Sequence, residues 1–441
     1  MSALLKLLYK NSRLKVSKVI TASSVTRIAL ASFIGTAIEF YDFYIYGMAT
    51  ALVIGPVFFP DGSQATQMLN AFLTFSVAFL TRPLGAMLFG HFGDRIGRKT
   101  TLVVSLIVMG VSTTLIGCLP GYSDIGVWAP ILLCCCRFGQ GIGLGGEWGG
   151  AALLATENAP AGKRGLYGMF PQLGPPVGFL LATGSFFLLA HFLTEQAFKD
   201  WGWRLPFLAS SILVMIGLYA RLALLETPVF VKVLQQDQLV VLPIKEVVKF
   251  HWGALILGAL AMVVCYALFY ISTVFSLSYG TTTLNIPRQY FLGILSVAVI
   301  FMAAATPLSA WAADHFGRRP VLLVACSGAF LSGFALEPML NSGSPLIITI
   351  FLSLELFLMG AIFAPMGALL PELFPPHLRY TGSGTAYNLG GILGASFAPY
   401  LAQRLVAYGG LDWVGGYVSL AAAISWLAVY LMRETRDNQW I

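Results

Sequence analysis

The stretch Gly90-His91-Phe92-Gly93-Asp94-Arg95-Ile96-Gly97-Arg98-Lys99 joins two long apolar segments, and a related stretch, Trp311-Ala312-Ala313-Asp314-His315-Phe316-Gly317-Arg318-Arg319, does the same in the second half of the chain. In both, an Asp is followed by Gly at +3, Arg at +4 and another basic residue at +5. The two Asp residues are 220 positions apart, half of the 441 residues. A basic hairpin repeated at half the chain length, each time between apolar segments, predicts two similar halves built from membrane-spanning helices.

The composition supports this prediction. Hydrophobic residues make up 57% of the chain and charged residues 10%, whereas soluble domains carry about 25% charged residues. So few charges cannot solvate a soluble protein of this size, and we expect the excess apolar surface to face lipid. The formal charge of +7 does not indicate a nucleic-acid partner, because the basic residues are dispersed in short loops without a basic, aromatic patch.

We expect no cofactor, metal site or enzyme active site. The cysteines, Cys118, Cys134, Cys135, Cys136, Cys265 and Cys326, all fall in apolar runs, and no pair has zinc-binding spacing. The five histidines form no ligand pair. The sequence shows no nucleophile–base pair, and it lacks the P-loop pattern of nucleotide-driven pumps.

Apolar runs of about 20 residues, the length that crosses a bilayer, predict twelve spans. They cover approximately residues 28–54, 66–92, 100–119, 128–155, 165–192, 204–224, 253–279, 289–312, 320–340, 346–370, 380–406 and 413–432. The predicted organisation is an N-terminal arm at 1–26, a six-helix bundle at 27–224, a linker at 225–252, a second six-helix bundle at 253–433 and a tail at 434–441. The basic arm either lies on anionic lipid or is disordered.

The positive charges set the expected orientation. Twelve spans put both ends of the chain on one side, and 20 of the 26 Lys and Arg residues lie on that side, with Arg221 at the end of span six counted among them. Only Lys199, Arg204 and Arg288 lie on the other. By the positive-inside rule, both termini and both basic hairpins are cytoplasmic.

A second repeat follows spans four and ten. Glu157 precedes Pro160 at +3 and Arg164 at +7, and Glu372 precedes Pro375 and Arg379 at the same offsets. These are corresponding places in a six-plus-six arrangement. Two repeats in the same order strengthen the prediction of two similar halves.

Four motifs resemble a known family. Residues 90–99 resemble the loop 2–3 motif of the major facilitator superfamily, and 137–145 resemble its helix-four motif. Residues 35–47 (GTAIEFYDFYIYG) and 145–152 (GGEWGGAA) are typical of its metabolite:proton symporter family, which includes carriers for shikimate, 2-oxoglutarate and proline or betaine. The resemblance implies an all-α protein with twelve transmembrane helices in two pseudo-symmetric bundles, located in the bacterial cytoplasmic (inner) membrane and functional as a monomer.

Ionisable groups inside the bilayer are costly and therefore informative. Glu39 lies twelve residues beyond Arg27, about 18 Å along a helix, and Asp42 and Tyr46 follow on the same face. Two carboxylates in one low-dielectric cavity do not both stay charged, so we expect at least one to carry the coupled proton. The alternative is a carboxylate held permanently by a neighbouring Arg or Tyr.

Span four carries a polar stripe of Arg137, Gln140 and Glu147. We expect Arg137 and Glu147 to act with Glu39 and Asp42 in proton coupling, and Arg137 and Gln140 to contact the substrate. Arg137 stays charged. It either attracts an anionic substrate and tunes the helix-one carboxylates, or forms a permanent ion pair with an acid. These two roles are compatible if the pair breaks during the cycle.

Further cavity candidates, each of which could instead be a packing residue, are Tyr41, Tyr46, Trp148, Gln172, Tyr266, Tyr270, Glu355, Tyr387 and Asn388. The predicted cytoplasmic network that holds the halves together comprises Arg82, Asp94, Arg95, Arg98, Glu157, Arg164, Asp314, Arg318, Glu372 and Arg379. The alternative for this network is topological anchoring by positive charge alone.

The expected function is secondary active transport: symport of protons with a small polar metabolite, foremost an organic acid, by alternating access. The alternatives are an uncoupled facilitator and a proton symporter of a zwitterionic osmolyte or a sugar-like polyol. The expected partners are the metabolite, protons and membrane lipid.

Overall fold

A computed structural model describes residues 22–160, 162–222 and 243–436, and every regular element in this part of the chain is a helix. The first six spans are α2–η1–α3 (Ala22–Ala49, Thr50–Ile54, Gly55–Phe58), α4 (Gln64–Arg95), α5 (Arg98–Cys118), α7 (Trp128–Glu157), α8–α9 (Arg164–Gln172, Gly174–Phe192) and α11 (Leu205–Leu222). The last six are α14–η3–α15 (Trp252–Tyr270, Ile271–Phe275, Ser276–Thr282), α16 (Arg288–Phe316), α17–η4–α18 (Arg318–Ser332, Gly333–Ala335, Leu336–Leu340), α19 (Pro345–Glu372), α20–η5–α21 (Arg379–Gly391, Ile392–Ser396, Ala398–Gly409) and α22 (Leu411–Leu431).

The prediction of twelve spanning helices is confirmed. Ten of the spans described are long and apolar enough to cross a membrane by length and composition alone. The other two, α7 and α20–η5–α21, contain glycines and polar residues that lower their hydropathy, but each is packed among the spans of the bundle. Their polar residues face other helices of the protein, so hydropathy alone underestimates the ability of these two segments to span a membrane.

Short helices connect the spans. They are α6 (Tyr122–Ile125), α10 (Glu195–Asp200), η2 (Gly202–Arg204) and α13 (Pro243–Phe250). Helix α13 lies within the predicted linker, whose residues 225–242 are outside the described ranges, as are 1–21 of the predicted arm. The fifth span, predicted as one segment, is divided at Leu173 between Pro171 and Pro175, because proline removes a backbone donor and bends a helix.

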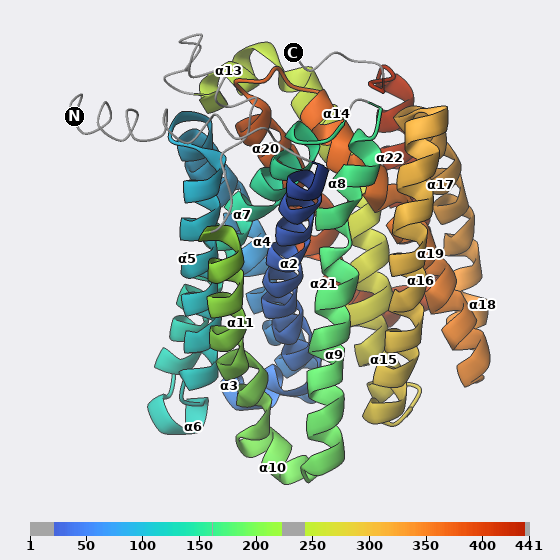
Figure 1. The fold of residues 1–441 in the computed structure, drawn as a ribbon. Coiled ribbons are helices and arrows are strands. Elements are labelled where there is room, and N and C mark those ends of the chain that lie inside the picture. The colour runs from blue at the N-terminus through green and yellow to red at the C-terminus, as the bar shows by residue number, and fades with distance from the viewer. Residues whose placement is uncertain (1–21, 161, 223–242, 437–441) are drawn as a thin grey trace, which may run out of the picture.

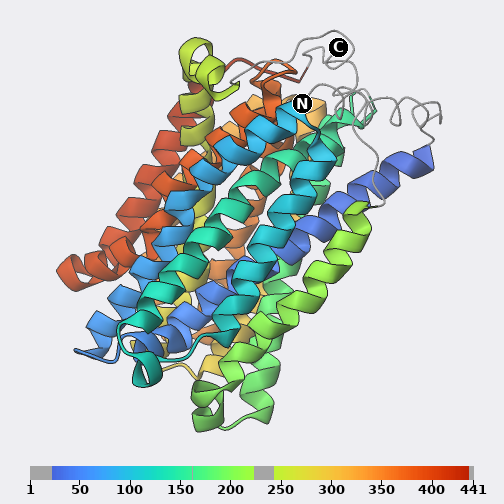
Figure 2. The same ribbon diagram turned by 90° about the vertical axis from the view of Figure 1, so that its left-hand side faces the viewer.

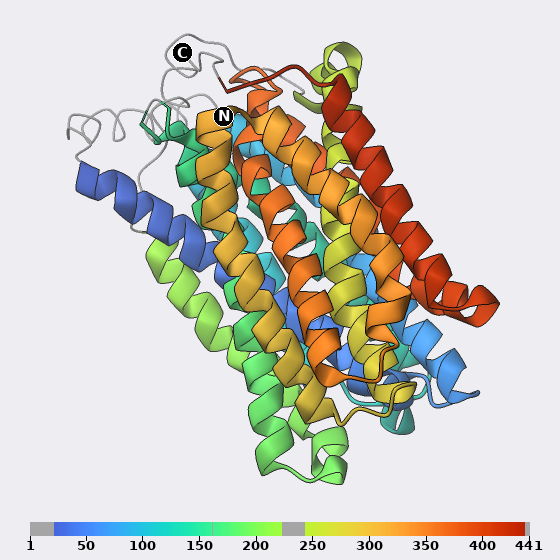
Figure 3. The same ribbon diagram turned by 90° about the vertical axis from the view of Figure 1, so that its right-hand side faces the viewer.

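The two halves lie side by side in Figure 1, and they contact each other through matching pairs of helices. Figure 2 is seen from the side of the first half and Figure 3 from the side of the second. Helix α4 of the first half packs on α20 of the second, and α16 of the second half packs on α8 and α9 of the first. Figure 1 shows α13 at one end of the molecule and α6 and α10 at the opposite end. The start of α2 and the end of α22 lie at the α13 end.

The halves also share an internal irregularity. Spans one and seven each contain a five-residue π-helical turn, η1 and η3, and these begin at Thr50 and Ile271, 221 positions apart. Such turns widen a helix locally and recur near functional sites. The repeated offset extends the duplication from the hairpins to the helix interiors.

Glycine is required at the +3 position of both hairpins. Gly97 caps the start of α5 with φ 127° and ψ 152°, and Gly317 caps the start of α17 with φ 103° and ψ 157°. This backbone region is accessible essentially only to glycine. The hairpin repeat is therefore a repeated backbone conformation as well as a repeated charge pattern.

We predict that Gly317→Ala destabilises the protein by about 1–3 kcal/mol, the usual cost of strained backbone. An added Cβ would also lie 2.6 Å from Glu434 Oε2. The matched control is Gly293→Ala in α16, where no heavy atom lies within 4 Å of the added carbon. Denaturant unfolding of the two purified variants checks this, and equal midpoints would contradict it.

Candidate functional site

Six charged side chains in the described part of the first half are almost completely buried. They are three acids, Glu39, Asp42 and Glu147, and three arginines, Arg82, Arg137 and Arg221, each at most 3% exposed. Buried charge in a membrane protein is expensive unless it is paired, hydrated or used. Their partners therefore indicate what each group does.

Arg221 and Glu147 form a buried ion pair that the sequence analysis missed. Arg221 Nη1 lies 2.8 Å from Glu147 Oε2 and donates to the Leu102 carbonyl at 2.8 Å. Ser105 donates to the same carboxylate at 3.3 Å. Gly35 makes room for this arginine, because a Cβ there would lie 2.9 Å from Arg221 Nε. From the sequence alone, Arg221 counts only as a positive charge on the side of the chain termini.

The two acids of helix one have different surroundings. The charges that act on Glu39 are Arg221, Arg82 and Asp42. The Asp42 carboxylate instead faces the hydroxyls of Ser210 and Thr113. No cation of the described chain lies within 4 Å of either carboxylate. The alternative of a carboxylate held permanently in an ion pair is thus not realised in this structure.

Arg137 is held by neutral groups rather than by an acid. Its guanidinium donates to Gln140 Oε1 and, at 3.2 Å, to the Phe75 carbonyl, and it lies 3.7 Å above the Tyr46 ring. Gln140 in turn donates to the Asp42 carbonyl at 3.0 Å and to Thr113 at 2.9 Å. The alternative of a permanent ion pair between Arg137 and an acid is not realised in this structure, because the glutamine and a backbone carbonyl accept hydrogen bonds from the guanidinium instead.

Arg82 does not lie where the sequence analysis put it. It was predicted in the cytoplasmic network, but its guanidinium carbon lies 4.3 Å from the Phe43 ring centre and 4.2 Å from that of Phe79. Its charge acts on Tyr270 and Tyr387 of the second half. Arg82 is therefore a central residue at the contact between the halves.

A polar and aromatic layer crosses between the halves beside Arg82. Trp148 stacks on Tyr387 with ring centres 4.0 Å apart and planes within 3°. Trp148 donates to Gln172 at 2.8 Å, and Gln172 donates to the Phe363 carbonyl at 2.7 Å. Asn388 donates to the Gly145 carbonyl at 3.0 Å. These four predicted cavity residues lie together and join the halves.

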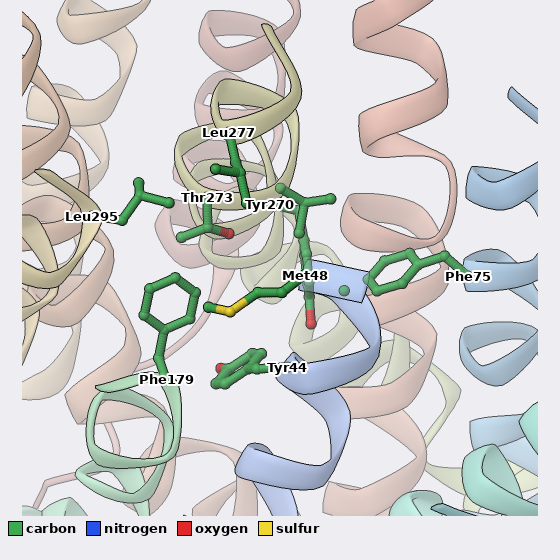
Figure 4. Close-up of a pocket in the computed structure, with 10 residues that line it drawn as sticks. Tyr44, Met48, Phe75, Phe179, Tyr270, Thr273, Leu277 and Leu295 are labelled. Atoms are coloured by element: carbon green, nitrogen blue, oxygen red, sulfur yellow. The ribbon is translucent and has the colours of Figure 1, made fainter. Parts of the chain in front are cut away.

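A small, mainly apolar pocket of about 10 Å³, with room for about one water molecule, lies next to this layer. Its lining comes from both halves: Tyr44, Gly47, Met48, Phe75, Phe179, Tyr270, Thr273, Val274, Leu277 and Leu295. Figure 4 shows Tyr44, Phe179 and Tyr270 gathered around Met48. Of the predicted residues only Tyr270 lines it; Tyr44, on the same helix as Glu39, had not been singled out.

Two predicted cavity residues lie elsewhere. The Tyr41 hydroxyl donates to the Pro206 carbonyl at 3.1 Å, so it packs against α11. Glu355 is buried, and its carboxyl faces Ser332 of α17. Placing both in the central cavity was wrong, because helical depth alone does not tell which neighbour a side chain faces.

The repeated hairpin acids cap helices of the opposite half. Asp94 of the first half accepts hydrogen bonds from Thr381 N at 3.1 Å and Thr381 Oγ1 at 2.7 Å, at the start of α20. Asp314 of the second half accepts from Gly165 N and Leu166 N, both at 2.9 Å, at the start of α8. A carboxylate at a helix N-terminus satisfies free N–H groups and the helix dipole. These bonds close the α13 end of the molecule.

More of the predicted network surrounds Asp314. Arg318 lies 2.8 Å from Asp314 Oδ1 and 3.3 Å from Glu372 Oε1. The charge of Arg164 acts on Glu372 and Asp314 from the first half. Arg379 donates to the Phe374 carbonyl at 3.1 Å, and Glu157 is buried at the end of α7. The side chains of Arg95 and Arg98 are outside the described part of the structure.

The predicted C-terminal tail takes part in the network around Asp314 and Arg318. Glu434 accepts from the backbone N–H groups of Arg318 and Arg319, both at 2.9 Å. Thr435 donates to Glu372 Oε2 at 2.6 Å. Burial opposes ionisation of Glu434, but the backbone donors outweigh it and lower the pKa of this carboxyl. The tail thus caps α17 beside the Arg318–Glu372 pair.

Comparison with known proteins gives a consistent result. The family model described as Major Facilitator Superfamily matches residues 32–399 and 294–440. The inner membrane metabolite transport protein YhjE of Escherichia coli K12 is 50% identical over 94% of this chain and 96% of its own. The shikimate transporter of the same strain is 39% identical over 95% and 96%. Its proline/betaine transporter is 34% identical over 96% and 85%.

Solved structures share the fold. The proton:xylose symporter XylE bound to 6-bromo-6-deoxy-D-glucose matches with a TM-score of 0.72 at 17% identity, over 95% of this chain and 100% of that one. A partially occluded, inward-open form of the E. coli xylose transporter XylE matches with a TM-score of 0.73 at 18% identity, over the same shares. At these identities the match concerns the fold alone.

We predict that Arg221→Gln destabilises the protein by about 3–5 kcal/mol, because it leaves the Glu147 carboxylate buried without its cation. Glu147→Gln has a similar cost for the converse reason. The double variant recovers most of the loss, since both charges are gone. A double-mutant cycle of thermal unfolding measures this, and additive losses would contradict the pairing.

A second prediction concerns pH. Because the pKa of Glu434 is lowered on folding, its cap contributes fully above the carboxyl's ordinary value of 4.5 and is lost as pH falls through the lower folded value. Glu434→Gln should therefore be less stable than wild type at pH 7, and the difference should shrink as the medium is acidified below 4.5. Melting temperatures measured from pH 7 downwards test this. A gap that is constant or grows on acidification would refute it.

Proposed function

The chain belongs to the major facilitator superfamily, and from that membership we propose that it carries out proton-coupled symport of a small carboxylated metabolite by alternating access. It is an integral, multi-pass membrane transporter and not an enzyme. The coupling, the substrate class and the direction of the helices in the membrane are the proposal.

The observation that carries proton coupling is the environment of Asp42. This carboxyl is fully buried and faces the hydroxyls of Ser210 and Thr113, with no cation of the described residues within 4 Å. An ionised carboxylate there would lack a counter-ion, so a bound proton is favoured. Glu39, one turn away on the same helix, is equally buried, and the charges of Arg221 and Arg82 act on it without an ion pair within 4 Å. The two neighbouring acids together form the proposed proton site.

The closed α13 end supports alternating access. Asp94 and Asp314 each bond across the halves, so opening that end requires both caps to break together. Tyr380 adds a bond to the Gly146 carbonyl at 2.5 Å. Two states separated by a few such bonds are close enough in energy for proton and substrate binding to shift the balance.

The relatives suggest the substrate class. The shikimate and proline/betaine transporters carry molecules that all bear a carboxylate. We propose an organic acid for this chain. A zwitterion such as a betaine is the second candidate, because the aromatic residues Tyr44, Phe75, Phe179 and Tyr270 around the cavity suit a quaternary ammonium group.

The remaining proposals follow the charge distribution. Both termini and the closed end would face the cytoplasm, because 20 of the 26 basic residues lie there. The membrane would be the bacterial inner membrane, as the name of the YhjE relative suggests. A single chain contains both halves and would function as a monomer.

The test is uptake by proteoliposomes of radiolabelled shikimate, succinate, proline and glycine betaine, with and without an inward proton gradient. We predict that wild type accumulates at least one of them only with the gradient. The double variant Glu39→Gln/Asp42→Asn should lose accumulation by about 100-fold or more, the scale of losing a coupled acid, yet still exchange labelled for unlabelled substrate. Gradient-driven accumulation that survives in this variant would rule out these acids as the coupling site.

A further inference from the structure

Arg82 has one free edge. Its Nε and Nη2 atoms are buried and meet no hydrogen-bond partner among the described residues, and the side chain is 1% exposed. These two nitrogens lie along one edge of the planar guanidinium group. That edge is one of those with which arginine binds a carboxylate through two parallel hydrogen bonds.

The other two buried arginines of the first half are already occupied. Arg221 has Glu147 and the Leu102 carbonyl, and Arg137 has Gln140 and the Phe75 carbonyl. Arg82 lies instead beside the rings of Phe43 and Phe79 and the Tyr270 hydroxyl, and no carboxylate of the described chain lies within 4 Å of it. Glu39 acts on it from farther away. Among these three arginines, only Arg82 has two adjacent donors left for a ligand.

The free edge lies where a transported ligand would be contacted by both halves. The charge of Arg82 acts on Tyr266, Tyr270 and Tyr387, which all come from the second half. The Tyr266 hydroxyl is buried and faces the Tyr387 hydroxyl without forming a well-aligned hydrogen bond. Tyr270 lines the apolar cavity, as does Phe75, whose ring lies 5.3 Å from that of Phe79. A cation with free donors therefore adjoins an apolar cavity.

We propose that Arg82 is the carboxylate anchor of the substrate site: its Nε and Nη2 bind the two oxygens of the substrate, Tyr266 donates a third hydrogen bond, and the rest of the molecule extends toward the apolar pocket, which widens to admit it. This inference rests on the proposed function in taking a carboxylated metabolite as substrate. It assigns recognition of the anion to Arg82 rather than to Arg137. The rings of Phe43 and Phe79 stabilise the guanidinium of Arg82 by cation–π interaction and leave its N–H donors available to the substrate.

The experiment is equilibrium binding to the purified protein without any ion gradient. The probes are shikimate, L-proline and glycine betaine, together with a series of C2–C6 mono- and dicarboxylates, each compared with its methyl ester. We expect at least one acid to bind wild type, and its ester to bind at least about 10-fold more weakly, because charge-assisted hydrogen bonds are lost. Arg82→Lys keeps the charge but loses the planar fork. It should weaken acid binding about 10- to 100-fold and leave ester binding within about twofold.

The matched control is Arg404→Gln, which removes an exposed arginine from α21 and should leave acid binding within about twofold. Tyr266→Phe deletes only the hydroxyl and should weaken the acid several-fold, so it keeps the proposal testable if the Arg82 variant does not fold. Equal binding of acid and ester, unchanged affinity in both Arg82→Lys and Tyr266→Phe, or no binding by any acid would each overturn the proposal.

The same assay separates this inference from proton coupling. Glu39→Gln/Asp42→Asn should still bind the acid here even though it no longer accumulates it. Loss of accumulation in that variant with normal acid selectivity would support both proposals. If wild type couples protons normally but acid binding is unchanged in Arg82→Lys, the role of Arg82 as carboxylate anchor is refuted while proton coupling is not.

Discussion

The structure depends on the requirement that charge buried in a membrane must be neutralised locally. Three acids and three arginines, each at most 3% exposed, lie within the first half. Only one pair of the six, Glu147 and Arg221, is joined directly. The other four charges are separated by glutamine, hydroxyls and aromatic rings, which leaves them free to respond to a proton or a ligand. A fully paired set would be more rigid and would have no reason to change state.

The second constraint is that neither half completes its own helix ends. The N-terminus of α20 is capped by Asp94 and that of α8 by Asp314, so each half satisfies backbone donors of the other. Opening this end exposes both sets of donors to water, which can replace the caps at small net cost. Because water can replace the carboxylate caps, the closed and open forms of this contact between the halves have similar free energies. The glycines at 97 and 317, with φ of 127° and 103°, turn the chain sharply directly after these acids.

The duplication, the twelve spans and the buried acids of helix one could be predicted from the sequence because each leaves a local pattern. The half of the molecule that each hairpin acid contacts could not be predicted, because Asp94 and Asp314 have the same sequence context as a simple basic loop. Arg221 was taken as an anchor at a helix end, although the apolar run continues to Leu225 and indicated a deeper position. Arg82 lies twelve residues before Asp94, about 18 Å, the same depth that placed Glu39 centrally. Applying that distance to both helices would have put them together.

The central claim is that proton and metabolite move together through one site, and simultaneous measurement of both fluxes tests it most directly. Sealed vesicles containing the purified protein and a trapped pH indicator are given the transported metabolite outside, with no gradient imposed. The account predicts that the vesicle interior acidifies as the labelled metabolite enters, with the two fluxes in constant ratio. Metabolite entry with no change in interior pH would contradict it.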